Sequence, residues 1–171
     1  MKHADAVRHL RNASAIALVA LAGALGVDSL SGNERVGVNR PHDIGPFKMI
    51  VELELPARVN VGEPVPMILR VRNGGTEPAE LALTGRPIAF DIVVEQPDGT
   101  EIWTRLRGDA VSMLLQVTIL QPGAAVEFTH RWDQRDTSGR AVRAGTYAVR
   151  GAVFTPDGKL ESESRRLVIS G

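Results

Sequence analysis

Histidine is the residue type in this chain best suited to general acid–base chemistry or to metal binding. The sequence contains four: His3, His9, His42 and His130. The first three precede any alternating pattern. His130 stands two residues from both Phe128 and Trp132, on the parity that faces inward in a half-buried strand. We therefore expect a core or rim histidine here, and not a general base.

The sequence lacks the other common constellations for catalysis. It contains no cysteine, which excludes disulfides, Cys-ligated zinc, iron–sulfur clusters and a thiol nucleophile. It also contains no Gly-x-Ser-x-Gly elbow, no glycine-rich phosphate loop and no paired-histidine metal motif. We expect no catalytic residue, no cofactor, no metal ligand and no small-molecule substrate. An enzyme is the least favoured class of function.

One acidic stretch, Asp133-x-x-Asp136-x-x-Gly139, has a passing likeness to a calcium loop. It lacks the spaced series of oxygen ligands and the terminal bidentate glutamate of an EF-type loop. Asp, Ser and Gly are also strong turn formers. Because alternating segments flank this stretch, we expect a hairpin turn in which Asp side chains cap backbone amides.

Three aromatic residues, Trp103, Trp132 and Tyr147, could stack against a ligand. The chain has only two Trp, one Tyr and four Phe, so we interpret these three as core residues. Tyr147 stands two residues before Val149, where an immunoglobulin domain has its second cysteine. This spacing predicts a tyrosine corner, with the ring half buried and the hydroxyl bonded to nearby backbone. Apolar packing around Val149 and Trp132 would then replace the disulfide.

The charge balance excludes one class of partner. Twenty Lys and Arg residues match twenty Asp and Glu residues, so no net field favours nucleic acid or an anionic membrane. Ten prolines and seventeen glycines are spread between short apolar alternations. That composition is typical of an all-β domain with many turns.

Apolar and polar residues alternate along most of the chain from Met49 onward, which predicts about eight or nine strands. The expected strands lie near 51–55, 65–71, 81–83, 88–94, 102–103, 117–119, 126–132, 147–153 and 167–169. Asn-Gly, Pro-Asp-Gly and Pro-Gly turns separate several of them. Strands at this spacing predict an antiparallel β-sandwich of immunoglobulin-like type.

The N-terminal region differs from the rest. Residues 1–30 combine a basic start with an uncharged apolar run of about fifteen residues, which is the pattern of a signal peptide and predicts a signal-like helix. We therefore expect export to the periplasm, cell envelope or medium. An uncleaved anchor and a cytoplasmic protein with no signal are the alternatives. Residues 31–48 are rich in Gly, Pro and charge and are expected to form a linker, followed by one domain over 49–171.

Four stretches in sequence order carry a resemblance to a known family. They are G-E-P-V-P-M-I-L-R-V-R-N, F-D-I-V-V-E-Q-P-D-G-T-E-I-W, L-Q-P-G-A-A-V-E-F-T-H-R-W-D and G-R-A-V-R-A-G-T-Y. Over 61–154 the chain resembles the BsuPI-type intracellular proteinase inhibitor domain. The Trp132-to-Tyr147 hairpin is also similar to the immunoglobulin-like domain of flagellar hook-assembly proteins. The first resemblance implies an immunoglobulin-like sandwich that inhibits serine proteases, although the family name says intracellular.

An inhibitor needs an exposed extended segment that is ordered before binding, so that little entropy is lost on docking. Residues 105–114 interrupt the strand pattern and are the first candidate, and 133–143 are the second. The candidate protease-contacting residues are Arg105, Leu106, Arg107, Met113 and Leu114. The two arginines would suit a trypsin-like pocket, and the apolar residues a subtilisin-like one. The alternative is a loop or one-turn helix whose apolar side chains cover an open end of the sandwich.

The sequence thus favours a serine proteinase inhibitor that acts by protein–protein contact. The second hypothesis is a non-inhibitory immunoglobulin-like module for binding or assembly in the cell envelope, using a sheet face or an edge strand. Neither hypothesis fixes the oligomeric state.

Overall fold

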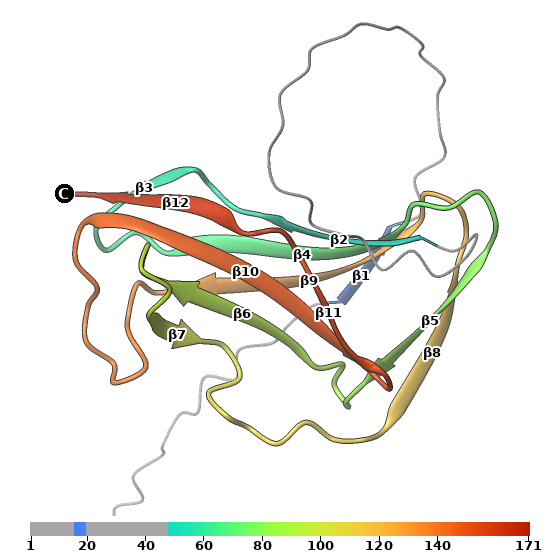
Figure 1. Ribbon diagram of the computed structural model, residues 1–171. Helices are drawn as coiled ribbons and strands as arrows, with labels where there is room; N and C mark the ends of the chain where they lie inside the picture. Colours follow the sequence, from blue (N-terminus) through green and yellow to red (C-terminus); the bar gives the residue numbers. More distant parts are fainter. Residues whose placement is uncertain (1–15, 20–47) are drawn as a thin grey trace, which may run out of the picture.

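The computed structural model describes residues 16–19 and 48–171, and all regular secondary structure in this part is β-strand (Figure 1). The expected signal peptide and linker lie outside the described residues, apart from Lys48 and the short strand β1 (Ile16–Val19). In the described part of the chain, no helix is long and apolar enough to cross a membrane.

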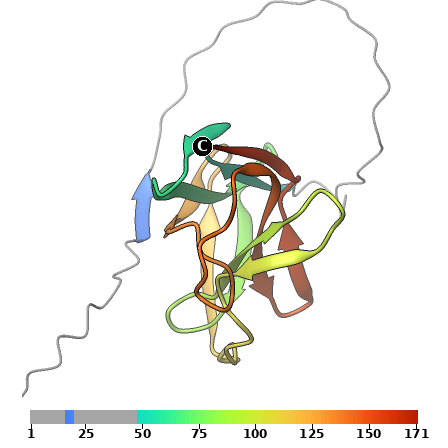
Figure 2. The same ribbon diagram turned by 90° about the vertical axis from the view of Figure 1, so that its left-hand side faces the viewer.

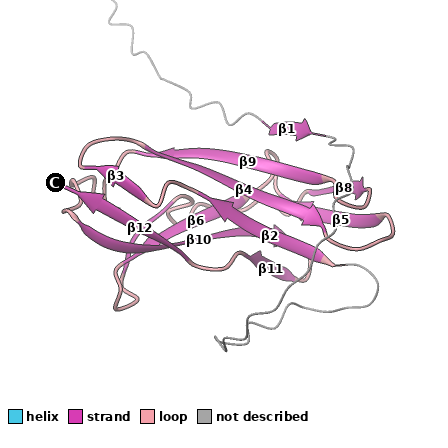
Figure 3. Ribbon diagram, turned by 90° about the horizontal axis from the view of Figure 1, so that it is seen from above, coloured by secondary structure: helices cyan, strands magenta, loops and turns pink. Residues whose placement is uncertain are grey.

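The first sheet is antiparallel and has the order β1-β9-β4-β2 (Figure 3). Its larger strands are β2 (Met49–Glu54), β4 (Val65–Asn73) and β9 (Ala125–Trp132). β4 is the centre of this sheet because it pairs along its length with both β2 and β9.

The second sheet has the order β3-β12-β10-β6-β7, and β11 pairs with β10. Its strands are β3 (Arg58–Asn60), β6 (Phe90–Glu95), β7 (Glu101–Thr104), β10 (Gly145–Thr155), β11 (Gly158–Glu161) and β12 (Arg165–Ser170). All of its pairs are antiparallel except β3 with β12. A separate two-stranded ribbon, β5 (Ala79–Thr84) with β8 (Leu115–Leu120), lies at one end of the molecule (Figure 1).

The core forms between the two sheets from the alternating apolar residues of each strand. On β4, every second residue from Val65 to Val71 is buried, and the residues between them are only partly buried or exposed. Phe90 of β6 stacks on Phe128 of β9, with ring centroids 5.1 Å apart, and so joins the sheets. A period of two on each strand is what places these side chains on one face.

The backbone of β10 packs closely against the Leu69 side chain of β4 at Gly151. A methyl group at Gly151 would overlap the side chain of Leu69, so this position accepts no side chain without displacement of that leucine. The glycine is therefore required by packing and not by a turn.

All nine expected strands are present, and the all-β expectation is confirmed. The pattern missed three short strands, β1, β3 and β11. β1 falls within the apolar run that was expected to belong to a signal peptide. β3 has three residues and is too short to show a period. β11 carries a single partly buried residue and pairs with β10 across the Pro156-Asp157-Gly158 turn.

The aromatic residues are in the core as expected. Trp132 is 1% exposed, and its Nε1 donates a hydrogen bond of 2.8 Å to the Arg135 carbonyl. Its ring lies 5.8 Å from that of Trp103 and 6.4 Å from that of Tyr147. The Tyr147 hydroxyl donates to the Arg143 carbonyl at 2.6 Å, which is the predicted tyrosine corner.

Trp132→Ala should lower the free energy of unfolding by about 3–5 kcal/mol, because it removes the largest fully buried side chain and leaves a cavity. Urea unfolding followed by circular dichroism measures the change. Val61→Ala is the control, since Val61 is 49% exposed and should change stability by less than about 0.5 kcal/mol. An unchanged unfolding midpoint for Trp132→Ala would contradict the core assignment.

Candidate functional site

The segment between β7 and β8, residues 105–114, is the candidate protease-contacting loop. It begins with a turn in which Asp109 N donates to the Leu106 carbonyl at 2.7 Å. The left-handed conformations of Arg107 (φ 49°) and Gly108 (φ 79°) form this turn. Residues 109–114 then continue with neither helix nor strand, along the lower edge of the molecule in Figure 1. The one-turn helix that sequence allowed is not formed.

A buried carboxylate holds the start of this loop. Asp91, on β6, is 8% exposed. It accepts hydrogen bonds from Thr104 Oγ1 at 2.9 Å, from Leu106 N at 3.1 Å and from Ile92 N at 2.9 Å. Because a buried carboxylate without donors is costly, these bonds favour one position of the chain at 104–106.

Arg105 also anchors the start of the loop to β6. Its Nη1 donates to the Phe90 carbonyl at 2.7 Å, and its guanidinium carbon lies 3.7 Å from the centroid of the Phe90 ring. Its backbone N donates to the Ile92 carbonyl at 3.0 Å. Burial lowers the pKa of Arg105, and the nearby carboxylates of Asp91 and Asp109 oppose this shift. Because the Arg105 guanidinium is bound to Phe90, this side chain is not free to enter a partner's pocket.

The other end of the loop is held by the ribbon. The Leu114 carbonyl accepts a hydrogen bond of 2.8 Å from Gly85 N, and the Gln116 side-chain amide donates to the Gly85 carbonyl. Leu115 then pairs with Thr84 at the start of β8. The loop is therefore fixed on both sides of the residues that protrude.

The residues between the two anchors include Met113, the most exposed large apolar side chain in the described chain. Met113 is 84% exposed and Leu114 is 46% exposed. Arg107 is exposed on the turn, and Leu106 is partly buried beside its anchors. The structure thus separates the five candidate residues into an anchoring residue, Arg105, and an exposed tip that carries Met113 and Leu114.

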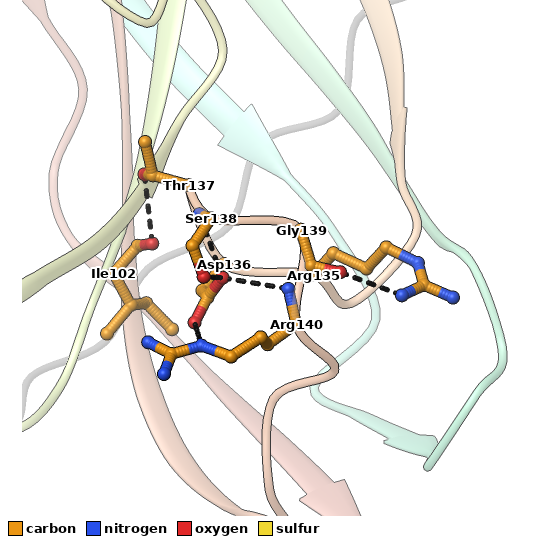
Figure 4. A network of polar contacts seen from close by, with 7 residues as sticks. All are labelled: Ile102, Arg135, Asp136, Thr137, Ser138, Gly139 and Arg140. Carbon is orange, nitrogen blue, oxygen red and sulfur yellow. Dashed lines mark hydrogen bonds and ion pairs between the residues drawn. The ribbon is translucent and has the colours of Figure 1, made fainter.

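The second candidate, the connection 133–143 between β9 and β10, lies at the end of the sandwich seen in Figure 2. The Asp136 carboxylate accepts hydrogen bonds from Ser138 N at 2.9 Å, Ser138 Oγ at 2.6 Å and Arg140 N at 2.9 Å, and it pairs with Arg140 Nε at 3.1 Å (Figure 4). The Ser138 hydroxyl is the main cause that lowers the pKa of Asp136 to about 2, with Arg140 assisting. These donors occupy the carboxylate, so the predicted capping of backbone amides by an Asp side chain is confirmed for Asp136. The predicted hairpin is wrong, because β9 belongs to the first sheet and β10 to the second, and the connection crosses between the sheets.

No group of three or more His, Cys, Asp or Glu side chains suited to a metal ion occurs in residues 16–19 and 48–171.

Gln134 attaches this second connection to the turn between β3 and β4. It is 3% exposed and has a left-handed backbone with φ 57°. Its amide nitrogen donates to the carbonyls of Asn60 at 2.8 Å and Glu63 at 2.6 Å, and its amide oxygen accepts from Gly62 N at 2.9 Å. Sequence analysis missed Gln134 and Asp91, because a single polar residue carries no periodic signal.

His130 lies at the rim of the core, as expected. Its ring stacks on that of Trp103, with centroids 5.3 Å apart. Burial lowers the pKa of His130, the positive charge of Arg105 lowers it further, and Asp133 opposes the shift. A histidine that resists protonation at the rim of a core supports packing and not proton transfer.

Comparison with known families gives a match over most of the described chain. Residues 52–157 match the family described as BsuPI, intracellular proteinase inhibitor. The chain belongs to this family. The predicted resemblance is thereby confirmed, and the matched region of the BsuPI-family protein contains both the 105–114 loop and the 133–143 connection.

Solved structures show only distant similarity to this BsuPI-family protein. Spo0M, a sporulation control protein from Bacillus subtilis, has a TM-score of 0.45 at 14% identity, over 75% of this chain and 51% of its own. The Pseudomonas fluorescens alkylpurine DNA glycosylase AlkC, bound to DNA, has a TM-score of 0.41 at 17% identity, over 74% and 31%. A CARDB domain from Pyrococcus furiosus, in complex with di-metal ions, has a TM-score of 0.38 at 15% identity, over 72% and 88%. No curated protein matches the chain.

The stability of this BsuPI-family protein should fall as the pH decreases below about 6.5. The folded state lowers the pKa of His130, so the unfolded chain binds the proton first. The contribution of His130 is complete above about pH 6.5 and is lost as the pH falls through the lower folded-state pKa. Urea unfolding between pH 7 and pH 5 measures this loss, which should shrink in His130→Phe.

The carboxyl groups whose pKa is lowered in the folded state titrate below pH 5. The change in stability between pH 7 and pH 5 therefore reports on His130 and not on these carboxyl groups. For example, the pKa of Asp136 falls from 3.8 to about 2, well below this pH range. An equal loss of stability in His130→Phe and wild type would contradict the assignment.

Proposed function

We propose that this protein inhibits serine proteases by protein–protein contact, with residues 110–114 as the segment that enters the protease's substrate cleft. Membership of a proteinase inhibitor family supports the activity. One structural observation carries the choice of segment: a largely exposed stretch with neither helix nor strand lies between two sets of hydrogen-bonded anchors.

A segment held in this way binds like a substrate at low entropic cost. Ordering a free loop on docking costs about 0.5–1.5 kcal/mol for each flexible side chain immobilised, in addition to its backbone. Asp91 and Arg105 at one end and Gly85 at the other meet part of this cost during folding. The Ser-His-Asp machinery of the protease then faces a peptide that stays in place and does not separate after cleavage.

The exposed tip selects an apolar primary pocket. Met113 is 84% exposed, flexible and unbranched, so it can enter a deep apolar pocket without disturbing the core. Arg105 is excluded because its guanidinium is bound to Phe90. Arg107 lies on the preceding turn and not on the extended stretch. The target class is therefore a protease with subtilisin-like preference for apolar side chains.

Replacement of residues 110–113 by Gly and Ser should abolish inhibition but preserve the fold, because all the anchors remain. We expect wild type to titrate a subtilisin-like protease stoichiometrically and the replacement to bind on the order of 100-fold more weakly, as loss of interface hot spots costs about 2–4 kcal/mol. Residual protease activity on a chromogenic substrate measures both.

The matched control replaces residues 137–140, the tip of the second candidate connection, in the same way. Inhibition should survive this change. Inhibition that is lost with 137–140 and kept with 110–113 would move the site to the second connection. A wild-type protein that reduces the activity of no serine protease would reject the proposed function itself.

A further inference from the structure

Strand β8 presents an apolar stripe beside an unpaired edge. Its outward residues Leu115, Val117 and Ile119 are 50%, 53% and 64% exposed. One edge of β8 pairs with β5, and within the described part of the chain the other edge pairs with no strand (Figure 1). Edge strands offer a row of free backbone donors and acceptors to any strand that approaches.

Three other sheet edges, those of β2, β3 and β7, carry the usual protection against such pairing. β2 has the exposed charges Glu52 and Glu54, β3 has three residues, and β7 has Glu101 and a register irregularity in its pairing with β6. β8 has six residues and no charge, no proline and no bulge in its pairing with β5. In addition, the whole stretch 110–126 contains no charged residue. β8 is thus less protected than these three edges and is suited to accept a partner strand.

We propose that β8 pairs with β8 of a second copy of this chain, antiparallel about a two-fold axis through Val117. Opposite residues in an antiparallel pair point to the same face, so a continuous outer face requires odd-numbered positions opposite odd-numbered ones. The register that centres the exposed stripe of Leu115, Val117 and Ile119 then places Val117 opposite its own copy, and Leu115 opposite Ile119.

This register makes the strand complementary to itself. Branched apolar side chains meet on the outer face, and Gln116 meets Thr118 on the inner face. Each such cross-strand pair contributes about 0.2–1 kcal/mol, and the uncharged strand brings no like charges together. Backbone hydrogen bonds along the edge add to these pairs and join the two ribbons into one four-stranded sheet. Met113 precedes β8 and is not one of the residues that pair in this register between 115 and 119.

The natural chain has no cysteine, so Val117→Cys introduces a single thiol at the two-fold axis. The Cβ atoms of directly opposite residues lie about 4.5–5.5 Å apart, which a disulfide can span with a small adjustment. Mild oxidation of the full chain should therefore give a covalent dimer on a non-reducing gel. Val61→Cys is the matched control, since Val61 has the same side chain and is 49% exposed on a distant turn. Cross-linking of Val117→Cys no faster than Val61→Cys would overturn the proposal.

Sedimentation velocity provides a second test that needs no covalent bond. Wild type should sediment as a dimer at about 50 µM, Val117→Lys should dimerise at least tenfold more weakly, and Val61→Lys should match wild type, because a lysine at an edge opposes strand pairing. Equal thermal midpoints of the three proteins confirm that each is folded. Either of two results overturns the dimer: a monomeric wild type at this concentration, or a Val117→Lys protein that dimerises as wild type does. If the wild type is monomeric and inhibits a protease, and Val117→Lys weakens that inhibition, the β8 edge contacts the protease and not a second copy of this chain.

Discussion

The buried carboxylate of Asp91 is the interaction on which the candidate site depends. It accepts hydrogen bonds from Thr104 Oγ1 and from the backbone amides of Ile92 and Leu106, and so attaches the end of β7 and the start of the loop to β6. A buried charge is tolerated only when donors surround it, which makes the loop's first residues part of the fold. Arg105 strengthens this attachment by lying over Phe90, whose ring stacks in turn on Phe128 of the other sheet. The protruding segment is thereby connected to the centre of the core.

The need to satisfy buried polar groups also explains why the two long connections, 133–143 and 105–114, differ. In the 133–143 connection, Asp136 accepts hydrogen bonds from backbone amides of its own turn, and Gln134 donates to backbone carbonyls of Asn60 and Glu63. The tip of this connection carries charged and small polar residues. In the 105–114 loop, the polar groups are used at the ends and the tip carries Met113 and Leu114. A polar turn whose groups are bonded within the fold stabilises the molecule alone, whereas an exposed apolar tip is stabilised most when another protein covers it. This contrast, together with membership of the BsuPI family, supports inhibition over a purely structural role for the loop.

Much of the fold could be predicted from the sequence because strand periodicity is a local signal. The parity of Phe128, His130 and Trp132 and the spacing of Tyr147 are visible in a few residues, and the structure confirms what they predicted. The roles of Arg105 and Arg107 could not be distinguished in this way, because the position of Phe90 and Asp91 relative to the loop depends on the pairing of β6 with β7. Asp91 itself alternates with apolar residues like any solvent-facing acid, and only the covering loop buries it.

The inhibition constant of Met113→Lys, measured in parallel on a subtilisin-like and a trypsin-like protease, tests the central claim most directly. If Met113 occupies the primary pocket, the substitution should weaken inhibition of the first enzyme on the order of 100-fold and strengthen inhibition of the second, because the pocket of each discriminates between apolar and basic side chains. Arg107→Ala should leave both constants within about threefold of wild type. Unchanged constants for Met113→Lys, with loss of inhibition in Arg107→Ala, would contradict the account.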